Sequence, residues 1–457
     1  MFHRLYGGVH PYDRKRAANK KPVQPLDRPP AHVILPMSMH VGGPCRPIVA
    51  VGDRVLLGQP VAEPDGPGAP IHASVSGKVK AIEPRPHPDG GEVLSVVIQN
   101  DFLDEPAPAL ERKSAPEDLT GWEAAELIEK AGIVGLGGGG FPTAAKLKEA
   151  IGVADTLIIN GAECEPYITA DHRLMLEEGE RLLGGVKVLM RALGLQKAVI
   201  AVEGNKLDAV NHLRALLGED SGIKVAVLRT GYPQGAEKLL IQKLTGRRVP
   251  PGGQAADVKC AVFNVATAAA VYDAVRDGLP LTRRIVTVAG GAVADQRNLL
   301  VPIGTPIEHL LEECGGLTAD PVRVLTGGPM MGVVQNDLSV PVLKGTNALL
   351  ALTRREFGRT PKREQPCIRC GRCIKACPMK LSPLFLDLYS RNFRPEMLEK
   401  NHLTDCIECG ACAYVCPARI PLVRSIRAAK EELRRREQPE ETPQEVPEEK
   451  REREESQ

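Results

Sequence analysis

The chain carries one cysteine pattern twice: Cys367-x-x-Cys370-x-x-Cys373-x-x-x-Cys377-Pro378 and Cys406-x-x-Cys409-x-x-Cys412-x-x-x-Cys416-Pro417. Each cysteine of the second copy lies 39 residues after its counterpart, and the two copies hold eight of the 12 cysteines of the chain. No apolar secretion leader is visible after Met1, so disulfides are not expected. Clustered thiols of this kind predict metal ligands in a reducing compartment.

The spacing is typical of two-cluster [4Fe–4S] ferredoxins. Three thiolates, each separated from the next by two residues, wrap one cluster, while the fourth binds the other cluster. A pair of zinc sites is the alternative, but zinc ribbons use two separate CxxC pairs. We therefore expect a ferredoxin-like domain over residues 360–425 that relays electrons from an upstream donor. Its predicted ligands are Cys367, Cys370, Cys373 and Cys416 for cluster one, and Cys406, Cys409, Cys412 and Cys377 for cluster two.

The sequence before the cysteines predicts a multidomain protein of α/β and β structure. Residues 1–30 form a basic, proline-rich lead-in that we expect to be extended. Residues 31–103 consist of short predicted strands broken by Gly and Pro, and they resemble the barrel-sandwich fold of lipoyl and biotinyl carrier domains. The tip at 63–68 has no lysine to modify, so a structural or docking module is expected.

Residues 119–280 alternate helical and strand patterns, which predicts a mostly parallel sheet covered by helices. Residues 281–352 suit a small β-grasp-like domain. The charged tail over 431–457 is expected to be disordered. The predicted helices span 122–131, 174–193 and 306–314, with a further helix starting at Thr143, and the predicted strands span 156–159, 198–202, 284–289 and 322–325.

Composition excludes two classes of protein. The net charge is +2 and aromatic residues make up 3%, which argues against a nucleic-acid binder. The sequence contains no run of about 18 apolar residues, so no membrane span is expected. Residue 2 is Phe rather than Gly and the final residues lack a prenylation cysteine, so no lipid anchor is expected either.

A glycine-rich stretch, Gly135-Leu136-Gly137-Gly138-Gly139-Gly140-Phe141-Pro142-Thr143, matches G-x-G-x-x-G by spacing. Its context differs from a dinucleotide-binding fold, because a helix precedes it and the next strand ends at Asn160. Glycines still allow backbone N–H groups to face a phosphate or a flat ring, and Lys146 in the following helix could pair with a phosphate. Glu163 and Glu165 are expected to point into the same crevice. The alternative is an ordinary turn with solvated glutamates.

These residues resemble the flavin-binding subunit of respiratory complex I. That family has G-R-G-G-x-G-F-P-T-x-x-K and N-x-x-E-x-E-P at matching places, and Tyr232-x-x-Gly235-x-Glu237 resembles its Y-x-x-G-x-E. Phe263-Asn264-Val265-Ala266-Thr267 resembles its N-N-V-E-T, with Ala266 in place of glutamate. Leu136 stands where the family has arginine.

The whole chain, over residues 1–425, resembles the RnfC family of the Rnf electron-transport complex. The resemblance rests on Phe2-x-x-x-x-Gly7-Gly8-Val9-His10-Pro11, Gly327-Gly328-Pro329-Met330-Met331-Gly332, the domain order and the cysteine repeat. It implies NADH beside Glu163, Glu165 and Glu237, whose carboxylates would hold ribose hydroxyls and the flavin edge. It implies FMN bound by Gly135, Gly137, Gly138, Gly139, Gly140, Lys146, Asn160 and Asn264.

The leading hypothesis is an oxidoreductase and translocase subunit that passes electrons between NADH and ferredoxin through FMN and the two clusters. Its implied partners are the other Rnf subunits, including membrane-spanning ones, and its expected location is peripheral, at the cytoplasmic side of the cell membrane. One alternative is a soluble flavin and iron–sulfur reductase similar to cobalamin reductase. The other is a non-enzymatic electron carrier or docking subunit, an interpretation that Leu136 and Ala266 keep open.

Overall fold

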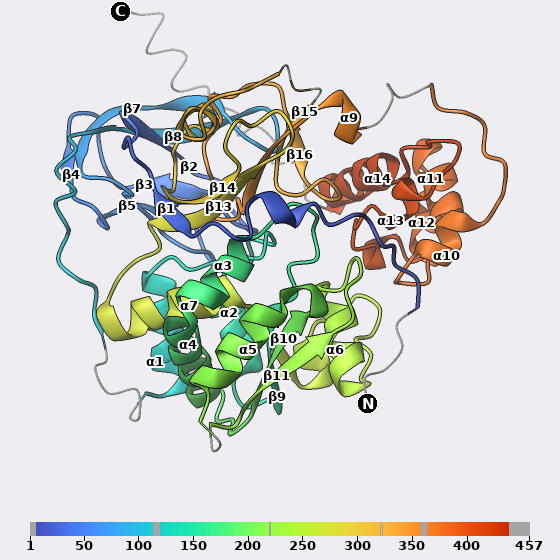
Figure 1. The fold of residues 1–457 in the computed structure, drawn as a ribbon, viewed down its shortest axis with the longest axis horizontal. Helices are drawn as coiled ribbons and strands as arrows, with labels where there is room; N and C mark the ends of the chain where they lie inside the picture. The colour runs from blue at the N-terminus through green and yellow to red at the C-terminus, as the bar shows by residue number, and fades with distance from the viewer. Residues whose placement is uncertain are drawn as a thin grey trace, which may run out of the picture.

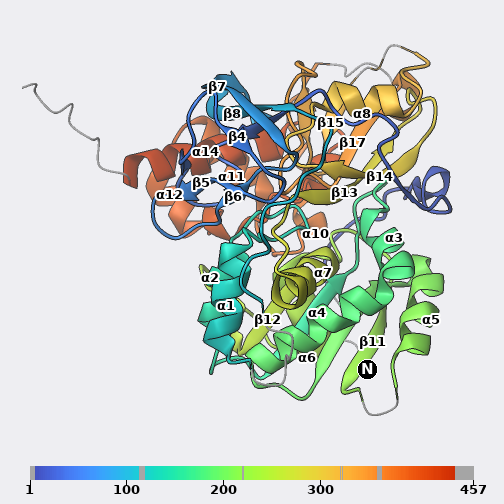
Figure 2. The ribbon, with the colours of Figure 1, turned by 90° about the vertical axis from the view of Figure 1, so that its left-hand side faces the viewer.

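The computed structural model describes residues 6–112, 119–218, 221–319, 321, 323–357 and 363–437. Figure 1 shows the α/β part at the bottom, two β-rich parts above it and the helical C-terminal part to one side. The view turned by 90° in Figure 2 shows the same separation of the α/β part from the β-rich parts. This arrangement confirms the multidomain α/β and β fold class.

The first β-rich part contains two antiparallel sheets, ordered β2-β8-β7-β4 and β3-β5-β6. Strands β4 and β7 pair with each other, with Arg54 opposite Lys78 and Val55 opposite Gly77. A Cβ on Gly77 would lie 1.9 Å from the Gln99 carbonyl oxygen, so only glycine fits there. The strands are β2 (His32–Pro36), β3 (Cys45–Pro47), β4 (Arg54–Val55), β5 (Pro60–Pro64), β6 (Ile71–His72), β7 (Gly77–Pro86) and β8 (Glu92–Asn100).

The α/β part is built on a four-stranded parallel sheet in the order β11-β10-β9-β12. The single helix expected over 174–193 was wrong, because Glu178 leaves the helical region with φ −122° and ψ 30°. The elements are α1 (Gly121–Lys130), α2 (Thr143–Ala150), β9 (Thr156–Gly161), α3 (Ala170–Glu177), α4 (Gly179–Ala192), β10 (Ala198–Glu203), α5 (Leu207–Leu216), β11 (Ile223–Leu228), α6 (Glu237–Thr245), β12 (Cys260–Asn264) and α7 (Val265–Tyr272).

The second β-rich part is a six-stranded mixed sheet in the order β1-β14-β13-β17-β15-β16. Its edge strand β1 (Val23–Pro25) comes from the lead-in and pairs in parallel with β14, so the lead-in is part of this sheet. Residue 322 of the expected strand 322–325 lies outside the described residues. The other elements are β13 (Arg283–Ala289), β14 (Arg297–Pro302), α8 (Ile307–Glu313), β15 (Arg323–Thr326), β16 (Val333–Gln335), β17 (Ala348–Leu352) and α9 (Arg354–Phe357).

The C-terminal part is a small helical domain around the cysteine repeat. The tail expected to be disordered from residue 431 is helical as far as Glu437, because α14 continues on an amphipathic pattern that packs Leu433 against the apolar cluster of Ile426 and Ala429. Residues 438–457 lie outside the described residues. The helices are α10 (Arg372–Ala376), α11 (Pro383–Arg391), α12 (Pro395–Lys400), α13 (Ala411–Tyr414) and α14 (Leu422–Glu437).

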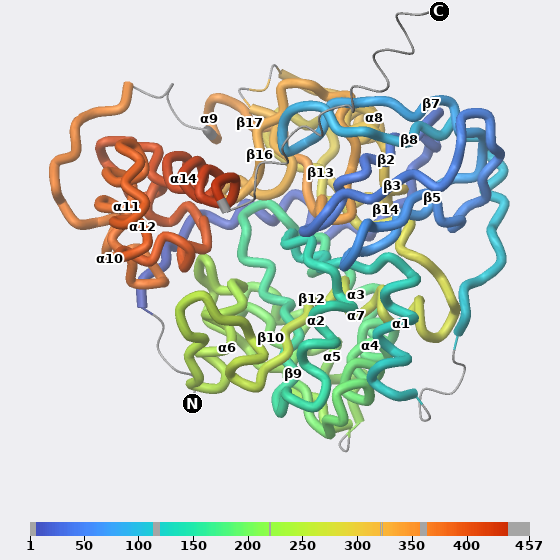
Figure 3. Tube along the Cα trace, turned by 180° about the vertical axis from the view of Figure 1, so that it is seen from behind, coloured from blue at the N-terminus to red at the C-terminus, as the bar shows by residue number. Residues whose placement is uncertain are grey.

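The N-terminal segment contacts both the α/β part and the C-terminal part. Val9 forms an antiparallel bridge with Tyr232 of the α/β part, and the Gly8 N–H donates to the Ala376 carbonyl at 2.9 Å. Figure 3 shows this segment from behind, lying between the helical C-terminal part and the α/β part. Within the described ranges, none of the helices combines the length and apolar character that crossing a membrane requires.

Candidate functional site

The strand order of the parallel sheet reverses between β9 and β12: from β9 the chain continues to β10 and β11 on one side, and β12 is added on the other side of β9. In open α/β sheets, ligands bind at the carboxyl ends of the strands at such a point. Asn160 and Asn264 occupy those two strand ends directly opposite each other. The Asn264 side-chain amide donates to the Asn160 carbonyl at 3.4 Å and to Asp171 at 2.7 Å, while its oxygen caps α7. The structure therefore brings these two predicted residues together.

The glycine loop lies beside this pair of asparagines. It is closed by hydrogen bonds from the Gly135 N–H to Phe141 and from the Gly140 N–H to Gly135, at 2.8 and 3.1 Å. A Cβ on Gly137 would lie 3.4 Å from the Asn264 side chain, whereas a Cβ on Gly139 would meet nothing within 4 Å. The loop thus presents bare backbone next to Asn264 at Gly137 and open space at Gly139, which suits a flat ring or a phosphate.

Leu136 and Ala266, the two residues that depart from the flavin-subunit pattern, lie close to each other. Leu136 is 3% exposed, and its N–H donates to Thr267 at 2.9 Å. Leu136 and Ala266 both line a cavity of about 540 Å³ where the α/β part meets the two β-rich parts. Neither the arginine nor the glutamate of that pattern is present here, so these two positions supply no charge.

Lys146 and Glu237 meet although they belong to different helices. Lys146 of α2 forms an ion pair with Glu237 at the start of α6. The lysine ammonium also lies 5.8 Å from the centre of the Phe263 ring. Both side chains are partly exposed.

The expectation that Glu163 and Glu165 share one crevice differs from the structure. Strand β9 ends at Gly161, and Glu163 adopts φ +44°, which breaks the alternation of a strand. The Glu163 carboxylate accepts from the Asp171 N–H at 2.7 Å. Glu165 instead accepts from the N–H groups of Met330 and Met331 at 3.1 and 2.9 Å. Burial raises the pKa of Glu165 to about 7.

Lys15 holds this turn and was missed by the sequence analysis. Its buried ammonium donates to the Glu163 and Glu165 carbonyls, each at 2.9 Å, and to the Ile168 carbonyl. It also lies 3.6 Å from the Glu163 carboxylate. A lysine in a basic lead-in, about 150 residues away in the chain, gives no local signal of this role.

Cysteines of one repeat lie beside cysteines of the other. Cys377 of the first copy lines one small cavity together with Cys406, Cys409 and Cys412 of the second. Burial raises the pKa of the Cys373 thiol, and the nearby thiols of Cys416 and Cys367 raise it further. Four thiols around one cavity suit a four-iron cluster. Cys367 and Cys370 are exposed, whereas Cys377, Cys409 and Cys412 are buried.

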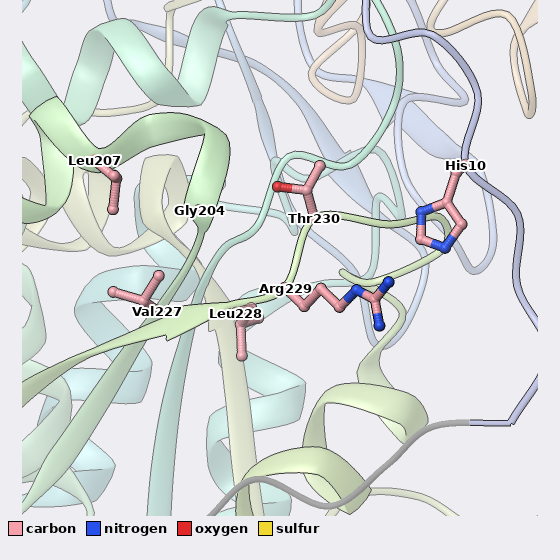
Figure 4. A pocket seen from close by; sticks show the side chains of 7 residues that line it. All are labelled: His10, Gly204, Leu207, Val227, Leu228, Arg229 and Thr230. Carbon is pink, nitrogen blue, oxygen red and sulfur yellow. The ribbon is translucent and has the colours of Figure 1, made fainter.

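A surface pocket of about 670 Å³ lies elsewhere, at the carboxyl ends of β10 and β11. Figure 4 shows the Arg229 guanidinium and the His10 imidazole on the same side of this pocket. None of the predicted flavin or NADH residues lines it. The predicted cofactor residues gather instead toward β9 and β12.

The fold and the two sites define a flavin and iron–sulfur electron-transfer protein. Four family models match the chain: the RnfC barrel-sandwich hybrid domain over 3–103, the Nuo51 FMN-binding domain over 128–273, the SLBB domain over 285–334 and a 4Fe-4S dicluster domain over 366–420. These matches establish FMN and iron–sulfur clusters as the cofactors.

Curated relatives match nearly the whole chain. The corresponding subunit of the Na⁺-translocating ferredoxin:NAD⁺ oxidoreductase complex of Acetobacterium woodii is 46% identical, covering 93% of this chain and 96% of that protein. Its counterpart in the proton-translocating complex of Clostridium ljungdahlii is 43% identical, covering 95% of both chains. The counterpart in the ion-translocating oxidoreductase complex of Rhodobacter capsulatus is also 43% identical, covering 96% of this chain and 85% of that protein. The chain belongs to this family, the RnfC proteins of the Rnf complex.

Among solved structures, the chain is similar to one chain of an NAD⁺-reducing [NiFe]-hydrogenase in the H₂-reduced state. The TM-score is 0.45 at 19% identity, covering 72% of this chain and 66% of that chain.

Proposed function

We propose that the chain is the electron-transfer subunit of a membrane-bound, ion-translocating complex that exchanges electrons between NADH and ferredoxin. One contact carries this proposal: the Tyr232 hydroxyl, in the α/β part, donates to the carbonyl of Cys409 at 2.7 Å. The predicted flavin domain therefore touches the backbone of a predicted cluster ligand. This contact holds the predicted flavin domain next to a predicted cluster, as electron transfer between the two requires.

FMN supplies the conversion between two-electron hydride chemistry and one-electron cluster chemistry. The residues of this chain that would hold it are the glycines of the loop, Lys146, Asn160 and Asn264. Glu237, which is partly exposed beside Lys146, would meet the NADH ribose. The carboxylates of Glu163 and Glu165 accept hydrogen bonds from backbone N–H groups. Their role in this proposal is to hold the turn after β9 in place rather than to contact the nucleotide.

The eight cysteines would hold two [4Fe–4S] clusters in the crossed sets described above. Protein purified without oxygen should contain about eight irons and one FMN per chain and should reduce a dye with NADH. Iron and flavin without NADH oxidation would favour a subunit that only carries electrons. One zinc with little iron would overturn the cluster assignment.

We further propose that the protein is peripheral, at the cytoplasmic side of the membrane, and held there by the other subunits of the complex. The net charge of +2 is too small for a general attraction to anionic lipid. In its host, the protein should sediment with membranes and be released by alkali without detergent. Deleting the membrane-spanning subunits should move it to the soluble fraction. If it is soluble when every subunit is present, the soluble-reductase alternative replaces this proposal.

A further inference from the structure

The two cysteine loops of the C-terminal part have the same backbone shape. We name residues 367–373 the cluster-one loop and residues 406–412 the cluster-two loop. Residues 39 positions apart adopt matching left-handed conformations: Arg369 and Glu408 with φ 53° and 54°, and Gly371 and Gly410 with 70° and 76°. The match continues beyond the loops, where Lys380 and Arg419 have φ 60° and 55°. Two loops of equal shape can therefore be compared position by position.

The cluster-two loop is docked inside the protein. Ile407 packs in an apolar cluster with Val9 and Tyr232. A Cβ on Gly410 would lie 2.8 Å from the Met330 carbonyl oxygen, so the loop is pressed closely against the second β-rich part. The charge of this loop, Glu408, is also satisfied internally, by Arg427 at 2.8 Å and Lys430 at 2.9 Å.

The cluster-one loop presents the same features to solvent. Ile368, which corresponds to Ile407, is 67% exposed, and its neighbours Cys367 and Cys370 are exposed too. Figures 1 and 3 both show the chain that leads into α10 running along the outer side of the C-terminal part. In the cluster-two loop, the corresponding isoleucine packs against the rest of the protein, whereas in the cluster-one loop no other described part of the chain covers Ile368 to that extent.

The charge of the cluster-one loop is positive where that of the cluster-two loop is negative. Arg369 occupies the position of Glu408, and Arg372 and Lys375 follow it, all three exposed. Among the described residues, none of these three cations forms an ion pair with a carboxylate. No Asp or Glu stands between Cys367 and Ala376. An exposed apolar centre with a rim of unpaired cations is complementary to an acidic protein surface.

We propose that the cluster-one loop is the docking surface for an acidic electron-transfer protein, and that cluster one is the outer end of the relay. This inference rests on the proposed function, because it requires that Cys367, Cys370, Cys373 and Cys416 hold a cluster. The loop that would hold cluster two lies against the flavin domain, where the Tyr232 hydroxyl donates to the Cys409 carbonyl. A cluster held by the cluster-one loop would supply one electron at a time to one acceptor centre of the partner, with no bond formed or broken.

The test uses cytochrome c as the electron acceptor, in its native basic form and in a succinylated form that is acidic. The full chain, purified without oxygen, is reduced with dithionite, desalted and mixed with each acceptor in a stopped-flow instrument. The wild type should reduce the acidic form faster at low salt, and added salt should remove this preference. The double variant Arg369→Glu/Arg372→Glu should reduce the acidic cytochrome c more slowly than the wild type, by about tenfold or more, and it should reduce the native cytochrome c faster.

Lys400→Glu is the matched control, because Lys400 is exposed at the end of α12 and outside both loops. It should leave both rates near those of the wild type, and cluster EPR spectra should be unchanged in every variant. Equal slowing with both acceptors would show a changed cluster potential and overturn the docking proposal, as would unchanged rates. Because the clusters are reduced chemically, a failure to oxidise NADH would count against the proposed function alone.

Discussion

Replacing Gly139 with valine tests whether the glycine loop receives the flavin. A Cβ at Gly139 meets no protein atom within 4 Å, and the backbone there is not left-handed. The unfolding free energy of the flavin-free protein should therefore stay within about 0.5 kcal/mol of the wild-type value. The added methyl groups would occupy this open space, where the flavin is proposed to lie, and overpacking of that kind costs about 1–3 kcal/mol. FMN affinity should fall by roughly fivefold to 150-fold.

The assay is a titration of flavin-stripped protein with FMN, followed by flavin fluorescence, with denaturant unfolding measured in parallel. Gly218→Val provides the control, because Gly218 also has open space around its Cβ position but lies beyond the end of α5. The control should bind FMN with wild-type affinity. If Gly139→Val also binds FMN as tightly as the wild type, the flavin does not lie against this loop and the assignment of the site is wrong.

Three further outcomes can be measured. Cys377→Ser should remove the EPR signal of the cluster bound by the second repeat, and Cys373→Ser that of the other; the reverse result would contradict the crossed ligand sets. Because burial raises the pKa of Glu165 to about 7, the folded state binds a proton that the unfolded state releases between about pH 4.5 and pH 7. The unfolding free energy should therefore fall by up to about 3 kcal/mol as pH rises through this window, and Glu165→Gln should flatten that slope; an unchanged slope would refute the assignment. Lys15→Met should destabilise the protein by about 3–5 kcal/mol, since it leaves the enclosed Glu163 carboxylate unpaired, and adding Glu163→Gln should recover part of the loss; purely additive losses would show that the two groups do not interact.

The sequence predicted most of the elements because their signals are local. Strand β10 and helix α1 follow hydrophobic periodicity, and their observed bounds lie within one residue of those predicted. The single helix expected over 174–193 is interrupted at Glu178, because the hydrophobic periodicity of the sequence continues there while the backbone leaves the helical conformation. Strand β1 was missed because three residues of a proline-rich lead-in form a strand only when β14 offers an edge to pair with.

The cluster chemistry could be deduced from the sequence because thiolate ligands at fixed spacing are required whatever surrounds them. What only the tertiary structure decided is how the two repeats differ. Their backbones match, but Ile407 is packed against Val9 and Tyr232 while Ile368 faces solvent. The same holds for Glu165, which a strand pattern places beside Glu163 but which the fold turns toward Met330 and Met331. Burial and long-range hydrogen bonds depend on segments far apart in the chain, so no local pattern records which loop is docked and which is left open.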